Sequence, residues 1–226
     1  MMRIDLISAV PELLVSPLNT SIMKRAQTKG LLTIEIHSLR DYTHDKHRLI
    51  DDKPFGGGAG MTLKAEPFFE CIRKLSSERV YDTVIYPSPR GKIFSQSDAN
   101  RLSLHGNLLF ILGHYKGIDE RVCQKFPGEE YSVGNFVLSG GELPALLMVD
   151  AIVRVIPGVL NDSESALSDS FQDGEMIGAP TYTRPAVLEG ITVPEVLLEG
   201  NHKAIAEWKA KQSQSFTEQW KKINNL

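Results

Sequence analysis

The chain has 226 residues, enough for one substantial α/β domain and a small second domain, and its 42% hydrophobic content is ordinary for a packed globular protein. A formal net charge of −3 excludes a uniformly basic surface, so any contact with nucleic acid must be local. Two cysteines, Cys71 and Cys123, are too few for a disulfide framework or a cysteine-based metal site, and they fit a reducing cytoplasm.

The first apolar run of the chain reads as a strand rather than a signal peptide, because Asp5 and Pro11 interrupt it. The longest apolar stretch, 143–160, contains Asp150 and is broken at Pro157, which argues against a membrane span. We therefore expect a soluble, cytoplasmic protein with no membrane partner.

Strand-like and helix-like runs alternate through the first half of the chain, a pattern typical of a mostly parallel α/β sheet. In chain order these runs cover 3–8, 13–29, 32–37, 67–75, 83–86 and 107–112. Open α/β sheets bind ligands outside the carboxyl ends of their strands. The strand ends at Tyr86 and Gly113 are therefore candidates for one crevice.

The segment 132–144, SVGNFVLSGGELP, carries a β-rich run into a double glycine and then into a helix. Gly134, Gly140 and Gly141 permit positive φ angles and the close approach of a ligand. The apolar residues between them could form a bed for a flat heterocycle. The alternative is a tight turn with no ligand.

The helix after the double glycine is expected over 142–156, with Pro144 in its first turn and Arg154 in its last, where a cation also complements the helix dipole. The segment 161–175 has five acids, four serines and no Lys or Arg, which is typical of a flexible linker. The last stretch, 201–226, is basic and bears aromatic residues, so it could contact RNA, although a solvated helix face is the alternative.

The glycine run 55–61, FGGGAGM, resembles a phosphate cradle but lacks the Lys and Ser/Thr of a P-loop. His44 and His47 could hold a metal, but a zinc site needs further ligands, so we expect a polar surface loop and no metal site.

Several ordered segments together resemble the bacterial tRNA (guanine-N1)-methyltransferases of the TrmD family. The matching segments are RDYTHDKHRLIDDKPFGGGAGM, LGHYKGIDER, VGNFVLSGGELPA, RVIPGVL, SDSF, YTRP and VPEVLLEGNH. The resemblance implies a SPOUT-class α/β fold: a parallel sheet with a deep C-terminal trefoil knot in the first domain, followed by a small α-helical domain. Such knots are rare exceptions to ordinary chain topology.

By this resemblance, residues 1–160 form the knotted domain that binds S-adenosylmethionine, 161–175 the linker, and 176–226 a small helical domain that binds tRNA. The implied activity is methyl transfer to N1 of guanosine 37 of tRNA, by a homodimer whose active sites lie between subunits. Asp169 matches the general base and Arg154 its cationic helper. Asp51 and Gly60 match substrate-binding positions. The implied methyl-donor site consists of Tyr86, Gly113, Tyr115, Gly117, Ser132, Val133, Gly134, Asn135, Phe136, Val137, Leu138, Gly140, Gly141 and Pro144.

The chain departs from the family pattern in the loop that usually reads GRYEG, where it carries His114 and Lys116. An ammonium group cannot ligate a cation, so assistance by Mg²⁺ at this loop stays an open question. Gly178 stands where the family usually carries an acid, and Asn135 where Asp is common. These departures leave two alternatives: a related RNA methyltransferase with another nucleotide preference, and an RNA-binding protein without turnover.

Overall fold

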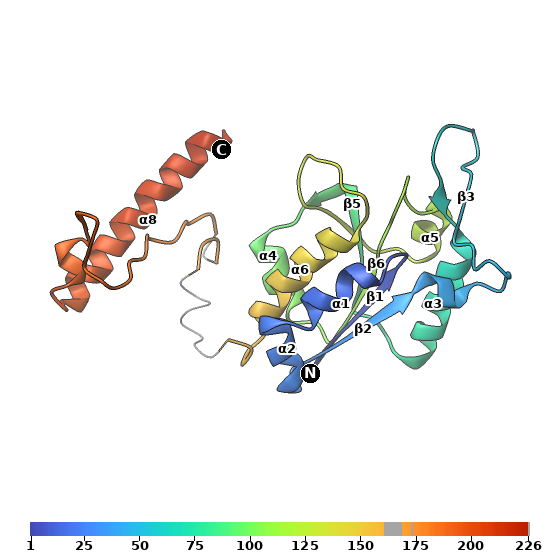
Figure 1. The fold of residues 1–226 in the computed structure, drawn as a ribbon, viewed down its shortest axis with the longest axis horizontal. Helices are drawn as coiled ribbons and strands as arrows, with labels where there is room; N and C mark the ends of the chain where they lie inside the picture. Colours follow the sequence, from blue (N-terminus) through green and yellow to red (C-terminus); the bar gives the residue numbers. More distant parts are fainter. Residues whose placement is uncertain (161–168, 173, 226) are drawn as a thin grey trace. The chain divides into compact units, whose positions relative to one another are not determined.

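The structure is a computed structural model that describes residues 1–160, 169–172 and 174–225. The chain forms two compact units, Met1–Asn161 and Asp162–Leu226, whose elements Figure 1 labels. None of the helices in the described part of the chain is both long and apolar enough to cross a bilayer. The candidate site lies within the first unit.

A five-stranded sheet in the order β2-β1-β6-β5-β7 organises the first unit, and all of its strand pairs are parallel. This confirms the predicted parallel α/β sheet. Parallel strands bury both faces, which explains their apolar sequences. The strands are β1 (Met2–Ser8), β2 (Leu32–Ser38), β5 (Thr83–Ile93), β6 (Asn107–Ile111) and β7 (Glu129–Ser132).

Helices connect the strands and cover both faces of the sheet (Figure 1). They are α1 (Glu12–Leu18), α2 (Ser21–Thr28), the 3-10 turn η1 (Leu39–Tyr42), α3 (Ala65–Glu78), α4 (Gln96–Leu102), α5 (Glu120–Lys125) and α6 (Glu142–Arg154). The helical run predicted over 13–29 is two helices, because Pro17 has no N–H for a helical bond and the Asn19 amide donates to the carbonyl of Val15 (2.8 Å).

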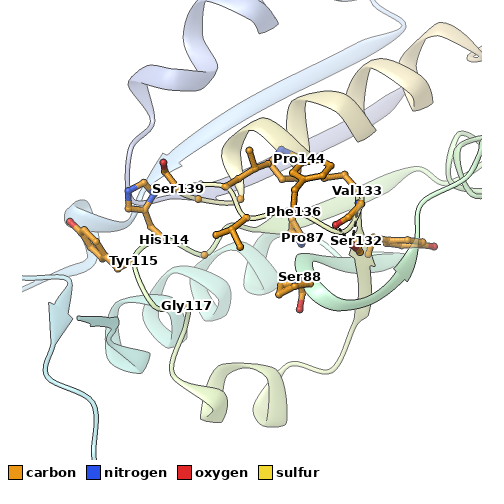
Figure 2. A pocket seen from close by; sticks show the side chains of 18 of the residues that line it. Pro87, Ser88, His114, Tyr115, Gly117, Ser132, Val133, Phe136, Ser139 and Pro144 are labelled. Carbon is orange, nitrogen blue, oxygen red and sulfur yellow. Dashed lines mark hydrogen bonds between the residues drawn. The ribbon is translucent and has the colours of Figure 1, made fainter. Parts of the chain in front are cut away.

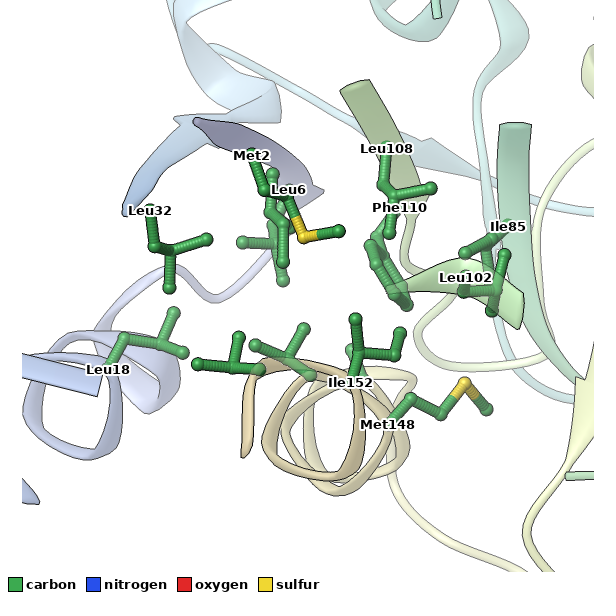
Figure 3. Close-up of a cluster of buried hydrophobic side chains, with 14 of the residues drawn as sticks. Met2, Leu6, Leu18, Leu32, Ile85, Leu102, Leu108, Phe110, Met148 and Ile152 are labelled. Atoms are coloured by element: carbon green, nitrogen blue, oxygen red, sulfur yellow. The ribbon is translucent and has the colours of Figure 1, made fainter. Parts of the chain in front are cut away.

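Two apolar clusters lie on the two faces of the sheet. One fills the space between the sheet and α1, α2, α4 and α6, and Figure 3 shows Leu6, Leu18, Phe110 and Ile152 meeting in it. The other lies against η1, α3 and α5. Because successive side chains of a strand point to opposite faces of the sheet, each strand contributes to both clusters. In β6, Leu108 and Phe110 belong to the first cluster, and Leu109 and Ile111 belong to the second.

The glycine run lies in a hairpin formed by β3 (Asp51–Asp52) and β4 (Thr62–Leu63). The φ angles of the glycines lie between 80° and 104°, a region that residues other than glycine rarely adopt. These glycines are Gly56, Gly57, Gly58 and Gly60. The run therefore builds a compact exposed loop, with Phe55 at 99% exposure.

The second unit consists of the long helix α8 (His202–Asn224) with a segment packed along it. It also contains β8 (Val187–Leu188) and β9 (Ile191–Thr192), a small antiparallel hairpin, and the 3-10 turn η2 (Glu195–Leu197). The Phe171 ring meets Trp220 at 5.4 Å and Tyr182 meets Trp208 at 6.4 Å between ring centroids. These tryptophans therefore hold the segment on α8.

Of the predicted linker 161–175, residues 161–168 and 173 lie outside the described residues. The described remainder is attached to α8: besides the Phe171 contact, Glu175 pairs with Lys221 at 2.6 Å. Just beyond it, the N–H of Ile177 donates to the Thr217 hydroxyl (2.9 Å). Asp169 thus immediately precedes a segment that packs on the second unit's helix.

Asp5 is a carboxylate fully buried in the middle of β1. It accepts hydrogen bonds from Arg3 (2.8 and 2.9 Å), the Tyr81 hydroxyl (2.9 Å) and His37 (2.7 Å). The Arg79 guanidinium lies 3.5 Å away. Burial alone would raise the pKa of Asp5, but the bonds from His37, Arg3 and Tyr81 outweigh it and lower the pKa from 3.8 to about 2. The folded state therefore favours the ionised carboxylate.

We expect Asp5→Asn to lower the free energy of unfolding at neutral pH by roughly 3 kcal/mol, because it leaves the cations around it without their buried partner. The folded-state pKa of Asp5 lies below its unfolded value. Its contribution is therefore complete above pH 3.8 and is lost as the pH falls towards about 2. Urea unfolding through the acid range should show a shallower decline in the variant. The control is Glu35→Gln, an exposed acid in register with Asp5 on β2. Equal effects of the two substitutions would contradict this role.

Candidate functional site

A cavity of about 310 Å³ opens at the carboxyl ends of β6 and β7, beside the middle of β5 where its pairing with β7 is interrupted. Its walls are residues 87–89 within β5, the loop after β6 (113–117), the end of β7 with the segment that follows it (131–141), and Pro144 in the first turn of α6. Figure 2 shows His114, Tyr115 and Ser139 at one end of it and Ser132 and Val133 at the other. This is where the sequence predicted a crevice, and the volume lies in the range of small-molecule sites.

The segment after β7 presents apolar side chains that the fold leaves uncovered. Phe136 is 60% exposed and Val137 is 95% exposed, and both line the cavity with Leu138. Contiguous exposed apolar groups in a concavity are typical of a ligand-binding surface. Pro87 and Pro89 supply further apolar surface to the cavity. The walls therefore suit a flat, largely apolar group better than a highly charged one.

The glycines of this segment are required for different reasons. Gly134 has φ 143°, and a Cβ on it would lie 2.5 Å from the Phe136 ring. Gly140 and Gly141 do not have positive φ, contrary to the prediction. They are close-approach positions: a Cβ on Gly141 would lie 3.2 Å from the backbone nitrogen of Gly113, where the two cavity walls meet.

The loop after β6 is held on both sides by main-chain hydrogen bonds. The Gly141 N–H donates to the Gly113 carbonyl (2.7 Å), which joins this loop to the start of α6. On its other side, the Lys116 N–H donates to the Met61 carbonyl (3.0 Å) in the glycine hairpin. Tyr115, between these anchors, has φ 59°, a conformation that costs energy for a residue with a side chain and that clusters at functional sites.

The conformation of the wall after β7 is stabilised by Ser132. Its hydroxyl accepts a hydrogen bond from the Gly134 N–H and lies equally close to the Gly134 carbonyl, both at 3.2 Å. Ser132 itself is 6% exposed. Its role in this geometry is to set the turn that presents the apolar bed.

Similarity to known proteins identifies the family of this chain. The family model described as tRNA (Guanine-1)-methyltransferase TrmD matches residues 2–223. The chain belongs to the TrmD family. Proteins named tRNA (guanine-N(1)-)-methyltransferase are 56% identical over 212 residues in Bacteroides fragilis, which is 94% of both chains, and 54% identical over 207 residues in Chlorobium luteolum, which is 92% of this chain and 89% of the relative. The relative in Flavobacterium psychrophilum is 53% identical over 208 residues, or 92% of each.

Most of the residues that the TrmD resemblance placed at the methyl donor line this one cavity. They are Gly113, Tyr115, Gly117, Ser132, Val133, Gly134, Phe136, Val137, Leu138, Gly140, Gly141 and Pro144. The sequence analysis did not assign seven further lining residues to the donor site: Pro87, Ser88, Pro89, His114, Lys116, Tyr131 and Ser139. The two prolines come directly after Tyr86, the strand end that the sequence predicted, so the rule that ligands bind beyond strand ends could have found them.

Two predicted donor-site residues do not line the cavity. Tyr86 is 4% exposed and its hydroxyl donates to the Phe126 carbonyl (2.6 Å), because strand alternation turns it into the second apolar cluster. Burial raises its pKa. It lines a neighbouring cavity of about 290 Å³, together with Arg90, which is paired with Glu130 at 3.0 Å. Asn135 is exposed and is not among the lining residues.

Neither of the predicted catalytic residues is among those that line the cavity. Arg154 ends α6, and a straight helix places it about 15 Å along the axis from Pro144, which borders the cavity. Asp169 belongs to the second unit. Of the predicted substrate residues, Asp51 begins the glycine hairpin, and the Gly60 backbone lies against the Lys116 side chain.

The lining residues fit the donor that the family implies better than they fit a metal. The described part of the chain contains no cluster of three or more His, Cys, Asp or Glu side chains that could hold a metal ion. His44, a metal candidate in the sequence, instead pairs with Glu70 at 2.7 Å on the surface. The exposed apolar bed and the close-packed glycines suit the flat adenine of S-adenosylmethionine.

We expect Gly140→Ala to lower the free energy of unfolding by about 2 kcal/mol, because its Cβ would lie 2.3 Å from both Glu142 and His114. Gly106→Ala is the matched control, since its Cβ would make an ordinary contact of 3.5 Å with Asp82, and we expect a change below about 0.5 kcal/mol. Urea unfolding of the two variants measures the difference. Equal stabilities would show that the walls yield at Gly140.

Proposed function

We propose that this protein transfers the methyl group of S-adenosylmethionine to N1 of guanosine 37 in tRNA. The observation that carries the proposal is the family match over 2–223. It is supported by one cavity that is lined by most of the residues that the resemblance assigned to the donor. Relatives at 50% to 56% identity bear the name of this activity. We assign Gly113, Tyr115, Gly117 and the wall 132–141 to the donor.

The assigned side chains suit the chemistry of guanine N1. This nitrogen carries a proton and is a poor nucleophile until that proton leaves, so we assign the general base to the Asp169 carboxylate. Arg154 would stabilise the negative charge that develops on O6. The donor supplies an electrophilic methyl group on a sulfonium. The chain's own contribution is to hold the guanine in line with that methyl group, remove the proton and exclude water.

The site as proposed needs two copies of the chain. Arg154 lies at the far end of α6 from the cavity of its own chain, and so a second copy is the natural source of this residue. The side chains of Leu143 and Leu147 on α6 are 55% and 53% exposed. At helical spacing they share one stripe of α6 with Asp150 and Arg154, so the apolar part of this stripe lies in the first half of the helix. A homodimer would bury this stripe and place Arg154 at the partner's cavity.

The fold proposal includes the SPOUT trefoil knot in the first unit, around the segment 132–141. This segment leaves β7 at one edge of the sheet and reaches α6 beside β1, so it crosses the carboxyl ends of β5 and β6. The main-chain bond between Gly141 and Gly113 lies on this crossing. We also propose that residues 176–226, which belong to the second unit, contact tRNA, and that the protein acts in the cytoplasm.

The side chain of Lys116 argues against the binding of Mg²⁺ at this loop. Its alkyl stem packs on Gly60 and it lines both neighbouring cavities. An ammonium group there repels a divalent cation. We therefore propose that no metal ion is bound by residue 116, and Asp51 and Gly60 are assigned to the tRNA side of the site.

The direct test is methylation of a tRNA with guanosine at 36 and 37 by the full chain and S-adenosylmethionine. We expect 1-methylguanosine at position 37, identified by mass spectrometry of the digested tRNA. A tRNA with adenosine at 37 is the control. Tight donor binding without methyl transfer would support the alternative of an RNA-binding protein, and methylation elsewhere that of another nucleotide preference.

We expect Asp169→Ala to lower kcat by at least about a hundred-fold, which is the range of general-base catalysis, and to leave the donor Kd nearly unchanged. Glu189→Gln, an exposed acid of the same unit, is the control and should retain full activity. Single-turnover kinetics and calorimetry measure the two quantities. An equal loss of donor affinity and turnover would contradict the role of Asp169 as base.

Mixed dimers test the shared site. Arg154→Ala should inactivate the site to which it contributes, and Gly134→Ala should block the donor cavity by displacing Phe136. If Arg154 acts across the interface, a mixed dimer has one intact site, and an equimolar mixture of the two inactive variants should regain about a quarter of wild-type activity. No activity in the mixture, with exchange of subunits verified, would place Arg154 at its own chain's cavity.

A further inference from the structure

Glu142 is a buried carboxylate that the proposed reaction does not use. It begins α6 and is 1% exposed. One oxygen, Oε1, accepts a hydrogen bond from the Ser8 hydroxyl (2.7 Å) at the carboxyl end of β1. Within the described residues, its other oxygen, Oε2, has no hydrogen-bond partner. A buried ionised oxygen without a donor is costly, so a group that can donate to it is to be expected nearby.

The imidazole of His114 is that group. Its Nδ1 lies 3.5 Å from Oε2 of Glu142 and is itself buried without a hydrogen-bond partner in the described part of the chain. The ring packs edge-on against Tyr115, with 4.8 Å between centroids. His114 also lines the donor cavity, at the end where Figure 2 shows it beside Ser139. The pair therefore lies between the cavity and the first turn of α6.

Gly140 leaves the space that this pair needs. A Cβ there would lie 2.3 Å from both Nδ1 of His114 and Oε2 of Glu142. The backbones of His114 and Gly140 also form an antiparallel bridge. Only a residue without a side chain lets imidazole and carboxylate face each other across this bridge. The contacts from Ser8 through Glu142 to His114 thus link β1, α6 and the loop after β6.

We propose that His114 is a positioning residue for the methyl donor: its Nδ1–H donates to the Glu142 carboxylate and holds the loop 113–117 against the wall 132–141. The gap of 3.5 Å closes to hydrogen-bond length when the donor fills the cavity. The affinity for the donor then depends on the hydrogen bond between His114 and Glu142, although Glu142 does not line the cavity. The inference rests on the proposed function, because it presumes that this cavity holds S-adenosylmethionine.

Substitutions at His114 separate the effect of its hydrogen bond on donor binding from the effect of its side-chain size. His114→Leu keeps a side chain of similar size but cannot donate, whereas His114→Asn places an amide N–H near the position of Nδ1. We expect His114→Leu to raise the donor Kd and the donor KM about ten-fold, with the KM for tRNA unchanged, and His114→Asn to stay within about three-fold of wild type. The control is His44→Leu in the exposed His44–Glu70 pair, which should leave the donor Kd unchanged.

A double-mutant cycle tests the pairing itself. Glu142→Gln keeps the size of the side chain and an oxygen for Ser8 but removes the charge. We expect Glu142→Gln alone to weaken donor binding about ten-fold. The double variant with His114→Leu should also bind about ten-fold more weakly than wild type, because either substitution alone already breaks the pair. Thermal unfolding verifies that the variants are folded. If Glu142→Gln does not fold, the comparison of His114→Asn with His114→Leu decides alone.

The result that would overturn the proposal is a hundred-fold loss in the double variant, or equal donor affinities of His114→Asn and His114→Leu. These outcomes differ from a failure of the proposed function. If the wild-type chain binds no S-adenosylmethionine, the function fails. If it binds and methylates while the His114 variants are unaffected, the function stands and His114 has no positioning role.

Discussion

The close approach of two chain segments at Gly113 and Gly141 is the constraint on which the rest of the first unit depends. The Gly141 N–H reaches the Gly113 carbonyl at 2.7 Å, and a side chain at Gly140 or Gly141 would force the segments apart. This contact fixes where α6 begins, and therefore how α6 packs on the sheet. It also joins the two walls of the cavity. One packing requirement thus sets both the core of the domain and the shape of its site.

The same arrangement leaves the proposed site incomplete within the first unit. The cavity supplies apolar surface and main-chain groups, with His114, Tyr115, Lys116 and Tyr131 as its ionisable side chains. The assigned carboxylate, Asp169, belongs to the second unit, and Arg154 lies at the opposite end of α6. In the proposed reaction the first unit holds the donor, whereas the chemistry on guanine needs residues that do not line this cavity.

The sequence predicted the parallel sheet and the position of the cavity, because strand alternation and glycine-punctuated strand ends are local patterns. It did not predict the reasons for individual residues. Tyr86 was a crevice candidate because it ends an apolar run, and the resemblance assigned it to the donor site, but β5 continues to Ile93 and its alternation buries that ring. Gly140 lines the cavity, but the sequence did not show that a side chain there would also collide with the buried Glu142 and His114. The pairing of Glu142 with His114 joins positions far apart in sequence, which no local pattern reveals.

The claim that this cavity holds the methyl donor is tested most directly by hydrogen–deuterium exchange of the full chain with and without S-adenosylmethionine. Exchange reports on the amides whose opening the ligand suppresses. We expect slower exchange in the segments 113–117 and 132–141, and little change in the glycine hairpin at 55–61. Protection confined to the hairpin, or no protection at a donor concentration that saturates binding, would contradict it.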